Sequence, residues 1–294
     1  MPRAQVIRSL AGGGLMGLAN LVPGVSGGTM LLAAGVYPQC VDALARVTTL
    51  RPDRQSVGLL LAVAGSAALV ILLLAGLVKS LVVEHRWAMY SLFLGSTLGG
   101  IPVLWRLIEK PEARTWAGSG AGLAAMVATS LAPASAAPAA EAPTLVLFLA
   151  GFGAFAAMML PGLSGGYLLV LSGQYITILG AIEDSRDSLL AAEGPQWATL
   201  TDPLAILAPF ALGCLTAVVG VSSLIRLLLL RQRAVTLGFL LGLLGGAVLG
   251  LWPFESDGGG PPLPDLARAV AAIGLVTGGF VLTSAIGRFG RDEA

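Results

Sequence analysis

Long apolar runs separated by short charged segments dominate this chain of 294 residues. Segments 57–78 and 204–225 contain no charged side chain. Because about 20 apolar residues are enough to cross the hydrocarbon core of a bilayer as a helix, the pattern predicts an all-α integral membrane protein. Only 11% of the residues are charged, whereas a soluble domain has about 25%. This difference excludes a large water-soluble core.

The apolar runs predict eight membrane-embedded units, two of which are broken by proline and glycine. We expect each broken unit to be a re-entrant helical hairpin, because its flanks of about 13–18 residues are short for separate crossings. The expected units are a hairpin over 9–45, spans over 57–80, 87–106 and 117–137, a second hairpin over 144–182, and spans over 203–226, 234–252 and 267–287.

The distribution of basic residues predicts the orientation of these units. With the N-terminus in the cytoplasm, the basic clusters at 46–54, 106–114, 226–233 and 288–291 fall on the cytoplasmic side, and the acidic segment 183–200 falls outside. This is the arrangement that the positive-inside rule describes. The pattern therefore predicts a multi-pass protein with both termini in the cytoplasm.

One short phrase occurs in both broken units. The first copy reads Pro23-Gly24-Val25-Ser26-Gly27-Gly28, and the second reads Pro161-Gly162-Leu163-Ser164-Gly165-Gly166, 138 positions later. Three spans follow each copy, and an odd number of crossings places the second half in the opposite orientation. We therefore predict an inverted repeat, as in many secondary transporters, with residues 1–138 as the first half and 139–294 as the second.

Each copy of the phrase predicts the end of one helix and the start of another within the membrane. Proline stops the incoming helix, glycine allows unusual backbone angles, and Ser26, Thr29 and Ser164 could cap the next helix. A helix N-terminus has unpaired N–H groups and a positive dipole end, which suit an anion such as phosphate. The alternative is that the glycines only allow close helix packing.

Other polar side chains flank the broken turns or start matched spans. Arg86 and Arg233, 147 positions apart, are either phosphate-contacting cations or interfacial anchors. Tyr37 and Tyr175 are either headgroup donors or interfacial aromatics. The candidate substrate-binding residues are Pro23, Gly24, Ser26, Gly27, Gly28, Thr29, Pro161, Gly162, Ser164, Gly165, Gly166, Arg86, Arg233, Asn20, Tyr37, Gln174 and Tyr175.

Several other functions are disfavoured by what the sequence contains. His85 is the only histidine, and Cys40 and Cys214 lie in apolar runs, so we expect no metal site and no cofactor. No basic cluster indicates a nucleic-acid partner. No nucleophile–base pair or embedded carboxylate cluster supports an enzyme such as a lipid phosphatase. The oligomeric state and any coupling proton or ion are left open.

The two phrases resemble the motifs of the polyprenyl-phosphate transporter family. The first motif of that family is similar to G-x-x-M-G-x-A-D-x-x-P-G-V-S-G-G-T followed by G-x-Y, and residues 13–29 with Gly35 and Tyr37 carry it here. The second is similar to L-P-G-x-S-G-S followed later by G-x-Y, and residues 160–166 with Gly173 and Tyr175 carry it here. Asn20 stands where the family has aspartate, and Gly166 replaces a small polar residue.

The resemblance implies a flippase-like transporter of undecaprenyl phosphate in a bacterial or archaeal plasma membrane. Such a protein would return the carrier lipid of cell-envelope synthesis to the cytoplasmic leaflet for reuse. The residues alone favour only an anion site in a two-fold transporter, and the lipid comes from the resemblance. A transporter or channel for a small water-soluble anion is therefore the alternative.

Overall fold

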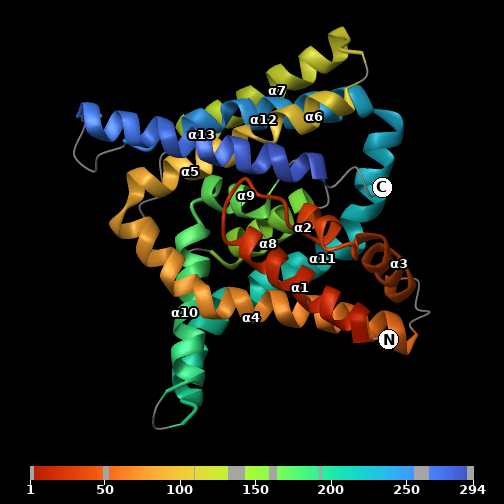
Figure 1. The fold of residues 1–294 in the computed structure, drawn as a ribbon, viewed down its shortest axis with the longest axis vertical. Helices are drawn as coiled ribbons and strands as arrows, with labels where there is room; N and C mark the ends of the chain where they lie inside the picture. The colour runs from red at the N-terminus through yellow and green to blue at the C-terminus, as the bar shows by residue number, and fades with distance from the viewer. Residues whose placement is uncertain are drawn as a thin grey trace.

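The computed structural model describes residues 3–48, 53–108, 110–131, 143–158, 164–191, 194–254 and 265–289, and their regular structure is entirely helical (Figure 1). The helices in chain order are α1 (Arg3–Asn20), α2 (Gly27–Ala33), α3 (Tyr37–Thr48), α4 (Arg54–Glu84), α5 (Arg86–Leu98), α6 (Ile101–Leu107), α7 (Ala113–Leu131), α8 (Thr144–Met158), α9 (Gly165–Leu171), α10 (Tyr175–Leu189), the 3₁₀ helix η2 (Trp197–Leu200), α11 (Thr201–Arg231), α12 (Arg233–Gly250) and α13 (Leu266–Phe289).

These helices confirm that the protein is all-α and apolar enough for a membrane. Among the described residues, four stretches are long and apolar enough to cross a bilayer, namely Arg54–Glu84, Trp197–Val218, Arg233–Gly250 and Leu266–Ile286. The bent pair α9 and α10, with an angle of 112° between them, makes a fifth if it counts as one span. The count of six spans therefore stays a prediction.

The two remaining predicted spans differ from the others in structure. The expected span 87–106 is divided into α5 and α6, because Pro102 near the start of α6 has no N–H to continue the α5 ladder. The expected span 117–137 corresponds to α7, and its residues 132–137 lie outside the described residues. None of α5, α6 and α7 is by itself both long enough and apolar enough to cross a bilayer.

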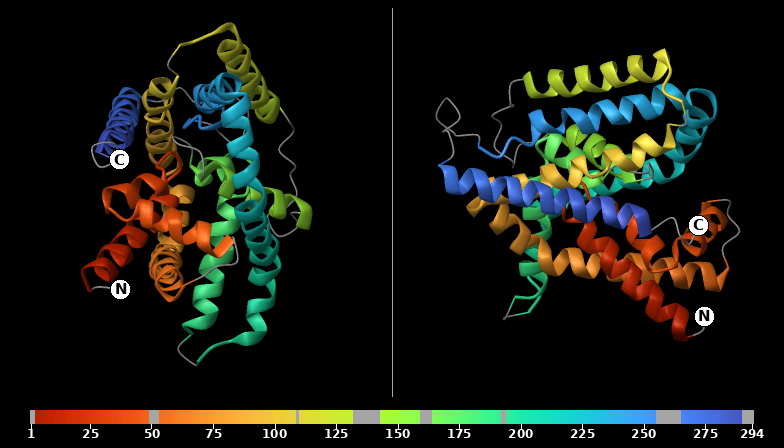
Figure 2. Two further views of the ribbon diagram at one scale, coloured as in Figure 1. Left: turned by 90° about the vertical axis from the view of Figure 1, so that its right-hand side faces the viewer. Right: turned by 45° about the horizontal axis from the view of Figure 1, so that its top comes forward.

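Helices at corresponding places in the two predicted halves have corresponding packing partners. Helix α1 packs along α4, and α8 packs along α11. Across the halves, α5 packs along α13 and α12 packs along α7, so these helices form a row in Figures 1 and 2. Helices α10 and α11 lie side by side and extend beyond the rest of the molecule (Figure 2).

Glycines form the closest contacts between the paired helices. A methyl group on Gly95 of α5 would overlap the carbonyl oxygen of Val276 on α13. A methyl group on Gly242 of α12, 147 positions later, would overlap the carbonyl oxygen of Ser119 on α7. Small residues allow helix backbones to approach this closely in a membrane. For these two glycines, the contacts favour a role in packing.

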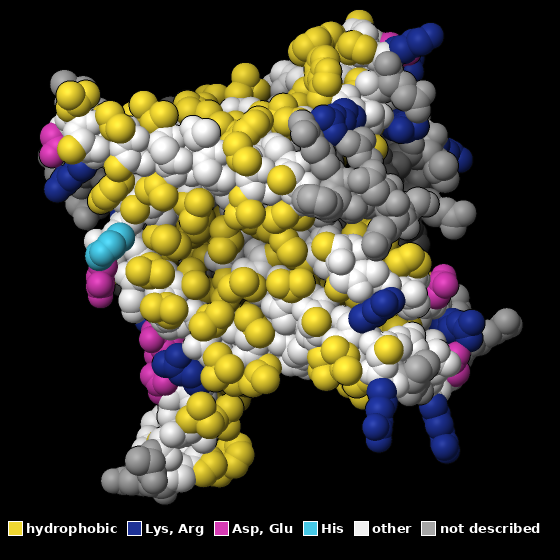
Figure 3. All heavy atoms as spheres, viewed as in Figure 1, with side chains coloured by type: hydrophobic (Ala, Val, Ile, Leu, Met, Phe, Trp, Pro, Cys, Tyr) yellow, Lys and Arg dark blue, Asp and Glu magenta, His cyan; other side chains and the backbone are white. Residues whose placement is uncertain are grey.

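Hydrophobic side chains cover the middle of the face shown in Figure 3, over α1, α4 and α13, while charged side chains gather toward its left and right edges. Leu61, Leu69 and Leu77 of α4 are among the exposed leucines. Exposed apolar surface of this extent is characteristic of contact with lipid or another protein rather than water. This face of the molecule is therefore suited to contact with the apolar interior of a bilayer.

The start of α4 is capped outside the apolar segment. Asp53 accepts a hydrogen bond of 2.6 Å from the N–H of Ser56, and Arg46 lies 2.6 Å from its other carboxylate oxygen. The Ser56 N–H, together with Arg46, holds the pKa of Asp53 below its usual value. The cap therefore loses its charge at a lower pH than an ordinary aspartate does.

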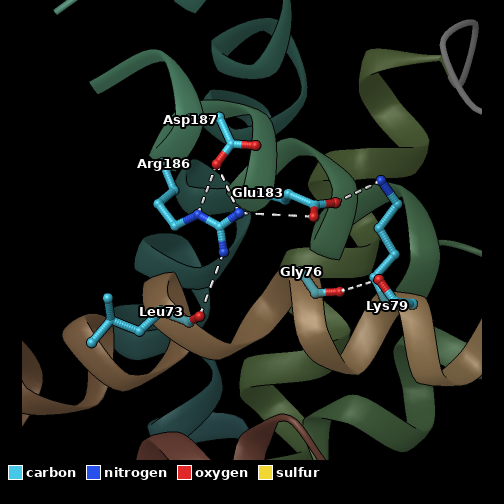
Figure 4. A network of polar contacts seen from close by, with 7 residues as sticks. Leu73, Gly76, Lys79, Glu183, Arg186 and Asp187 are labelled. Atoms are coloured by element: carbon cyan, nitrogen blue, oxygen red, sulfur yellow. Dashed lines mark hydrogen bonds and ion pairs between the residues drawn. The ribbon is translucent and has the colours of Figure 1, made fainter. Parts of the chain in front are cut away.

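Charged side chains join α4 of the first predicted half to α10 of the second (Figure 4). Lys79 Nζ lies 2.9 Å from Glu183 Oε2. Arg186 lies 3.8 Å from the other oxygen of Glu183 and 2.7 Å from Asp187. Gly76 leaves room for the Glu183 carboxylate, because a methyl group there would overlap it. Two helices that are distant in sequence are thereby held together by an ion network.

Gly242→Ala should weaken the contact between α12 and α7. The added methyl group overlaps a helix backbone that cannot move independently, so we expect the free energy of unfolding to fall by about 1–3 kcal/mol. Gly245→Ala on the same helix is the control, because nothing lies within 4 Å of a methyl group there. The measurement is unfolding in mixed micelles, and equal stability of the two variants would contradict the packing model.

Glu183→Gln should loosen α10 from α4. The side chains of Lys79 and Glu183 are 31% and 23% exposed, so solvent screens part of their attraction, and we expect a loss of about 1–2 kcal/mol. Asp184→Asn changes the same charge at an exposed neighbouring position and should alter stability by less than about 0.5 kcal/mol. Thermal unfolding in detergent compares the two, and identical shifts would show that net charge alone matters.

Candidate functional site

The first broken turn, residues 21–26, connects α1 to α2 and contacts the end of α5. Gly24 has a φ of +94°, a left-handed conformation that other residues rarely adopt. A methyl group on Gly24 would lie 2.7 Å from Thr97 Oγ1 and 2.6 Å from the carbonyl carbon of Ser96. Pro23, beside it, is fully buried. Glycine is required at position 24 by both the backbone angle and the contact with α5.

Ser26 and Ser164 occupy the N-cap positions of α2 and α9, as the sequence predicts, with extended backbone conformations. The prediction that their hydroxyls cap these helices is wrong, because neither hydroxyl makes a capping hydrogen bond. The cap position depends on the backbone, whereas the bond also needs a side-chain rotamer that the sequence does not fix. Ser164 is buried, and its hydroxyl has no hydrogen-bond partner among the described residues.

The start of α9 contacts the first broken turn near the centre of the molecule (Figure 1). A methyl group on Gly166 would lie 3.2 Å from the carbonyl oxygen of Asn20 and 3.4 Å from Cα of Pro23. Tyr175, the first residue of α10, donates a hydrogen bond from its hydroxyl to the carbonyl of Leu21. The described parts of the two broken units therefore meet in space. Pro161, Gly162 and Leu163 of the second phrase lie outside the described residues.

The short helices of the two units end in the same turn. Gly35 after α2 has a φ of +67°, and Gly173 after α9 has a φ of +70°. In both, the N–H of the following residue donates to the carbonyl five residues earlier, at 3.0 and 2.9 Å respectively. This is the helix C-terminal motif in which glycine adopts the left-handed conformation. The turn explains the repeated G-x-Y spacing, because Tyr37 and Tyr175 begin the next helices.

The two tyrosines have different surroundings. Tyr175 is buried and packs edge-on against Phe93, with ring centroids 5.9 Å apart. Burial excludes the interfacial interpretation for Tyr175. Tyr37 is exposed, so either interpretation stays open for that residue. Gln174 occupies the N-cap position of α10 without a side-chain capping bond, and its amide nitrogen donates to the carbonyl of Ser172 at 3.4 Å.

Gly27 and Gly165 each pack against the helix that precedes their turn. A methyl group on Gly27 would lie 2.8 Å from Oδ1 of Asn20 at the end of α1. A methyl group on Gly165 would lie 2.7 Å from a carbonyl oxygen of α8. Gly28 has only ordinary contacts. Thr29 lies inside α2 and is partly exposed, so its predicted capping role is wrong. The second glycine of each motif therefore has an equivalent position in the two units.

The two candidate arginines lie away from the contact between the turns. The guanidinium carbon of Arg86 lies 4.7 Å from the centre of the Tyr90 ring, a cation–π geometry. Thr97, which contacts Gly24, is about 16 Å further along α5 by helical rise. Arg233 donates a hydrogen bond of 3.2 Å to the carbonyl of Leu107 and lines a cavity of about 240 Å³ with Lys110. The structure does not bring either arginine to the turns.

Two polar residues at the end of α5 were not selected from the sequence. Ser96 and Thr97 are fully buried, and their hydroxyls have no hydrogen-bond partner among the described residues. The available signal was a pair of hydroxyl residues within an apolar span. That pair was missed because the repeat does not preserve it, since the matching positions 243 and 244 are both leucine.

Gly24→Ala should destabilise the first turn more than Gly173→Ala destabilises the second. Alanine at either position adopts a left-handed conformation that costs about 1–2 kcal/mol. A methyl group on Gly173 meets open space, whereas one on Gly24 collides with Thr97. Unfolding measurements should therefore show an additional loss of about 1–3 kcal/mol for Gly24→Ala. Equal losses would mean that the turn does not rest on α5.

Comparison with known proteins agrees with the resemblance of the two phrases. A family model described as undecaprenyl phosphate translocase-like matches residues 16–258. A polyprenyl-phosphate transporter of Vibrio cholerae serotype O1 is 31% identical over 254 residues, which are 82% of this chain and 75% of that protein. A polyprenyl-phosphate transporter of Staphylococcus aureus is 26% identical over 282 residues, 93% of each chain. No solved structure matches. Because the family model covers more than half of the chain, this protein belongs to the undecaprenyl phosphate translocase-like family.

Proposed function

We propose that this protein moves polyprenyl phosphate, specifically undecaprenyl phosphate, between the two leaflets of a bacterial plasma membrane. Its family and the names of both relatives support the substrate. Both relatives are named transporters, which is consistent with a protein that is not an enzyme. Neither name supports the alternative of a small water-soluble anion. The structural observation that carries the proposal is the contact between α9 and the first broken turn.

An inverted repeat of residues 1–138 and 139–294 would account for the matched packing. Helices α1 and α4 correspond to α8 and α11, and the pair α5–α13 corresponds to α12–α7. The matched close contacts at Gly95 and Gly242 support the same duplication. We infer that the first and second broken units are re-entrant hairpins that enter from opposite sides, with both termini in the cytoplasm. Both hairpins would place their breaks at mid-depth.

The proposed headgroup site lies where the two broken units meet. Gly166 contacts the first turn at Asn20 and Pro23, and the buried hydroxyl of Ser164 lies two residues before it without a partner. A phosphate oxygen could accept a hydrogen bond from that hydroxyl, and bonds of this kind to a charged group are among the stronger ones. The prenyl tail would stay in the bilayer while the headgroup crosses.

The two arginines suit the ends of the pathway better than its centre. Helix α5 starts with Arg86, α12 starts with Arg233, and the two helices run in opposite directions in Figure 1. Arg86 and Arg233 would therefore attract the headgroup at opposite faces of the membrane. Arg233 and Lys110 are basic residues in the lining of one cavity, and Glu112 is an acidic residue in the same lining. Alternating access would come from movement of one half against the other.

Transfer of undecaprenyl phosphate between leaflets of proteoliposomes tests the proposed function. We expect Ser164→Ala to reduce the transfer rate by about tenfold or more, because a hydrogen bond to a charged group is worth about 1.5–3 kcal/mol. Ser91→Ala is the matched control. Ser91 is fully buried in α5, and its hydroxyl already donates to the carbonyl of Trp87 at 2.6 Å.

A wild-type protein that fails to accelerate transfer would overturn the proposed function. If the wild type transfers the lipid, and the Ser164→Ala and Arg86→Ala variants transfer it at the same rate, the assigned site is refuted. Inorganic phosphate added at a large excess should not abolish lipid transfer. If it did, while a labelled small anion crossed the vesicle wall at a comparable rate, the small-anion alternative would replace the lipid.

A further inference from the structure

The hydroxyl of Thr97, which lies next to the first broken turn, makes no hydrogen bond with the described residues. Serine and threonine within helices commonly donate to the carbonyl four residues earlier. Ser66, Ser91, Ser185 and Thr277 do so in this structure, at 2.8, 2.6, 2.7 and 2.8 Å. Thr97 does not, although it lies in the last turn of α5.

The environment of Thr97 makes this difference significant. Its side chain has an exposure of 0%, and none of the described residues provides a hydrogen-bond partner for its hydroxyl. A buried hydroxyl without a partner is unfavourable, and such groups are uncommon in folded proteins. Ser91, six residues earlier on the same helix α5, is equally buried, and its hydroxyl donates a hydrogen bond to the carbonyl of Trp87. Burial in an apolar span therefore does not by itself explain the unsatisfied group.

The position of Thr97 relates it to both broken units. Its hydroxyl oxygen lies 2.7 Å from the place where a methyl group on Gly24 would stand. Pro23, the residue before Gly24, contacts Gly166 of α9. Adjacent residues of the first turn thus contact the end of α5 and the start of α9. The hydroxyls of Thr97 and Ser164, both buried and without partners, belong to the two helix ends that touch this turn.

We propose that Thr97 is a further headgroup-binding residue, whose hydroxyl donates a hydrogen bond to a phosphate monoester. This inference rests on the proposed function and adds a residue from α5 to its site. The side chains of Asn20, Ser164 and Thr97 are uncharged and carry N–H or O–H donors, which suits an anion with several acceptor oxygens. Because Gly24 covers Thr97 here, the ligand reaches the hydroxyl only when the first turn moves away from α5.

Thr97→Val tests this role, because valine keeps the shape and removes the hydroxyl. Purified protein in detergent is titrated with undecaprenyl phosphate, and affinity and thermal stability are measured for each variant. We expect Thr97→Val to weaken binding about tenfold or more. Thr97→Ser should keep the wild-type affinity, and so should the control Ser91→Ala. The ligand-free Tm of Thr97→Val should equal or exceed that of the wild type, since an unsatisfied hydroxyl has been removed.

The possible results separate this inference from the function on which it rests. If the wild type binds the lipid phosphate and Thr97→Val binds it with the same affinity, only the role of Thr97 is overturned. A lower ligand-free Tm in Thr97→Val has the same consequence, because the hydroxyl would then stabilise the protein itself. If the wild type does not bind undecaprenyl phosphate, or binds undecaprenol equally well, both proposals fail. Displacement of the lipid by equimolar inorganic phosphate would show a free-phosphate site instead.

Discussion

The backbone of a membrane protein must satisfy its own N–H and C=O groups, and this constraint governs the broken units. Lipid provides no hydrogen bonds, so a helix can stop at membrane depth only where protein or a water-filled cavity surrounds the break. Turn bonds from Leu21 and Val22 to the end of α1 satisfy part of the first break. The Tyr175 hydroxyl satisfies the carbonyl of Leu21 from the other broken unit. Each interrupted segment is therefore stable only when the rest of the chain encloses it.

Much of the helical architecture could be predicted from periodicity and from helix-breaking residues. The apolar runs predicted the helices, and Pro23 with its neighbouring glycines predicted the break between α1 and α2. The divided span at α5 and α6 was missed, although Pro102 lies inside the expected span 87–106. A single proline within an apolar run is compatible with either a kinked helix or two helices, and only the packing of α6 against α12 and α13 decides between them.

The candidate site was predicted where it depends on local backbone chemistry and missed where it depends on tertiary contacts. Gly24 could be selected because a break in a helix needs a backbone conformation that glycine allows. The burial of Tyr175 and its bond to Leu21 join residues 154 positions apart, which no local pattern encodes. Likewise, Ser96 and Thr97 become relevant only because the fold brings the end of α5 against Gly24. Membership of the family supports the lipid, which the residues alone did not identify.

The pairing of α5 with α13 has a consequence for how the protein is made. Helix α5 emerges from the ribosome long before its partner, which is the last described helix of the chain. The close approach of Gly95 to the backbone at Val276 can therefore form only after α13 has been synthesised. A nascent chain halted before α13 would leave α5 without its neighbour.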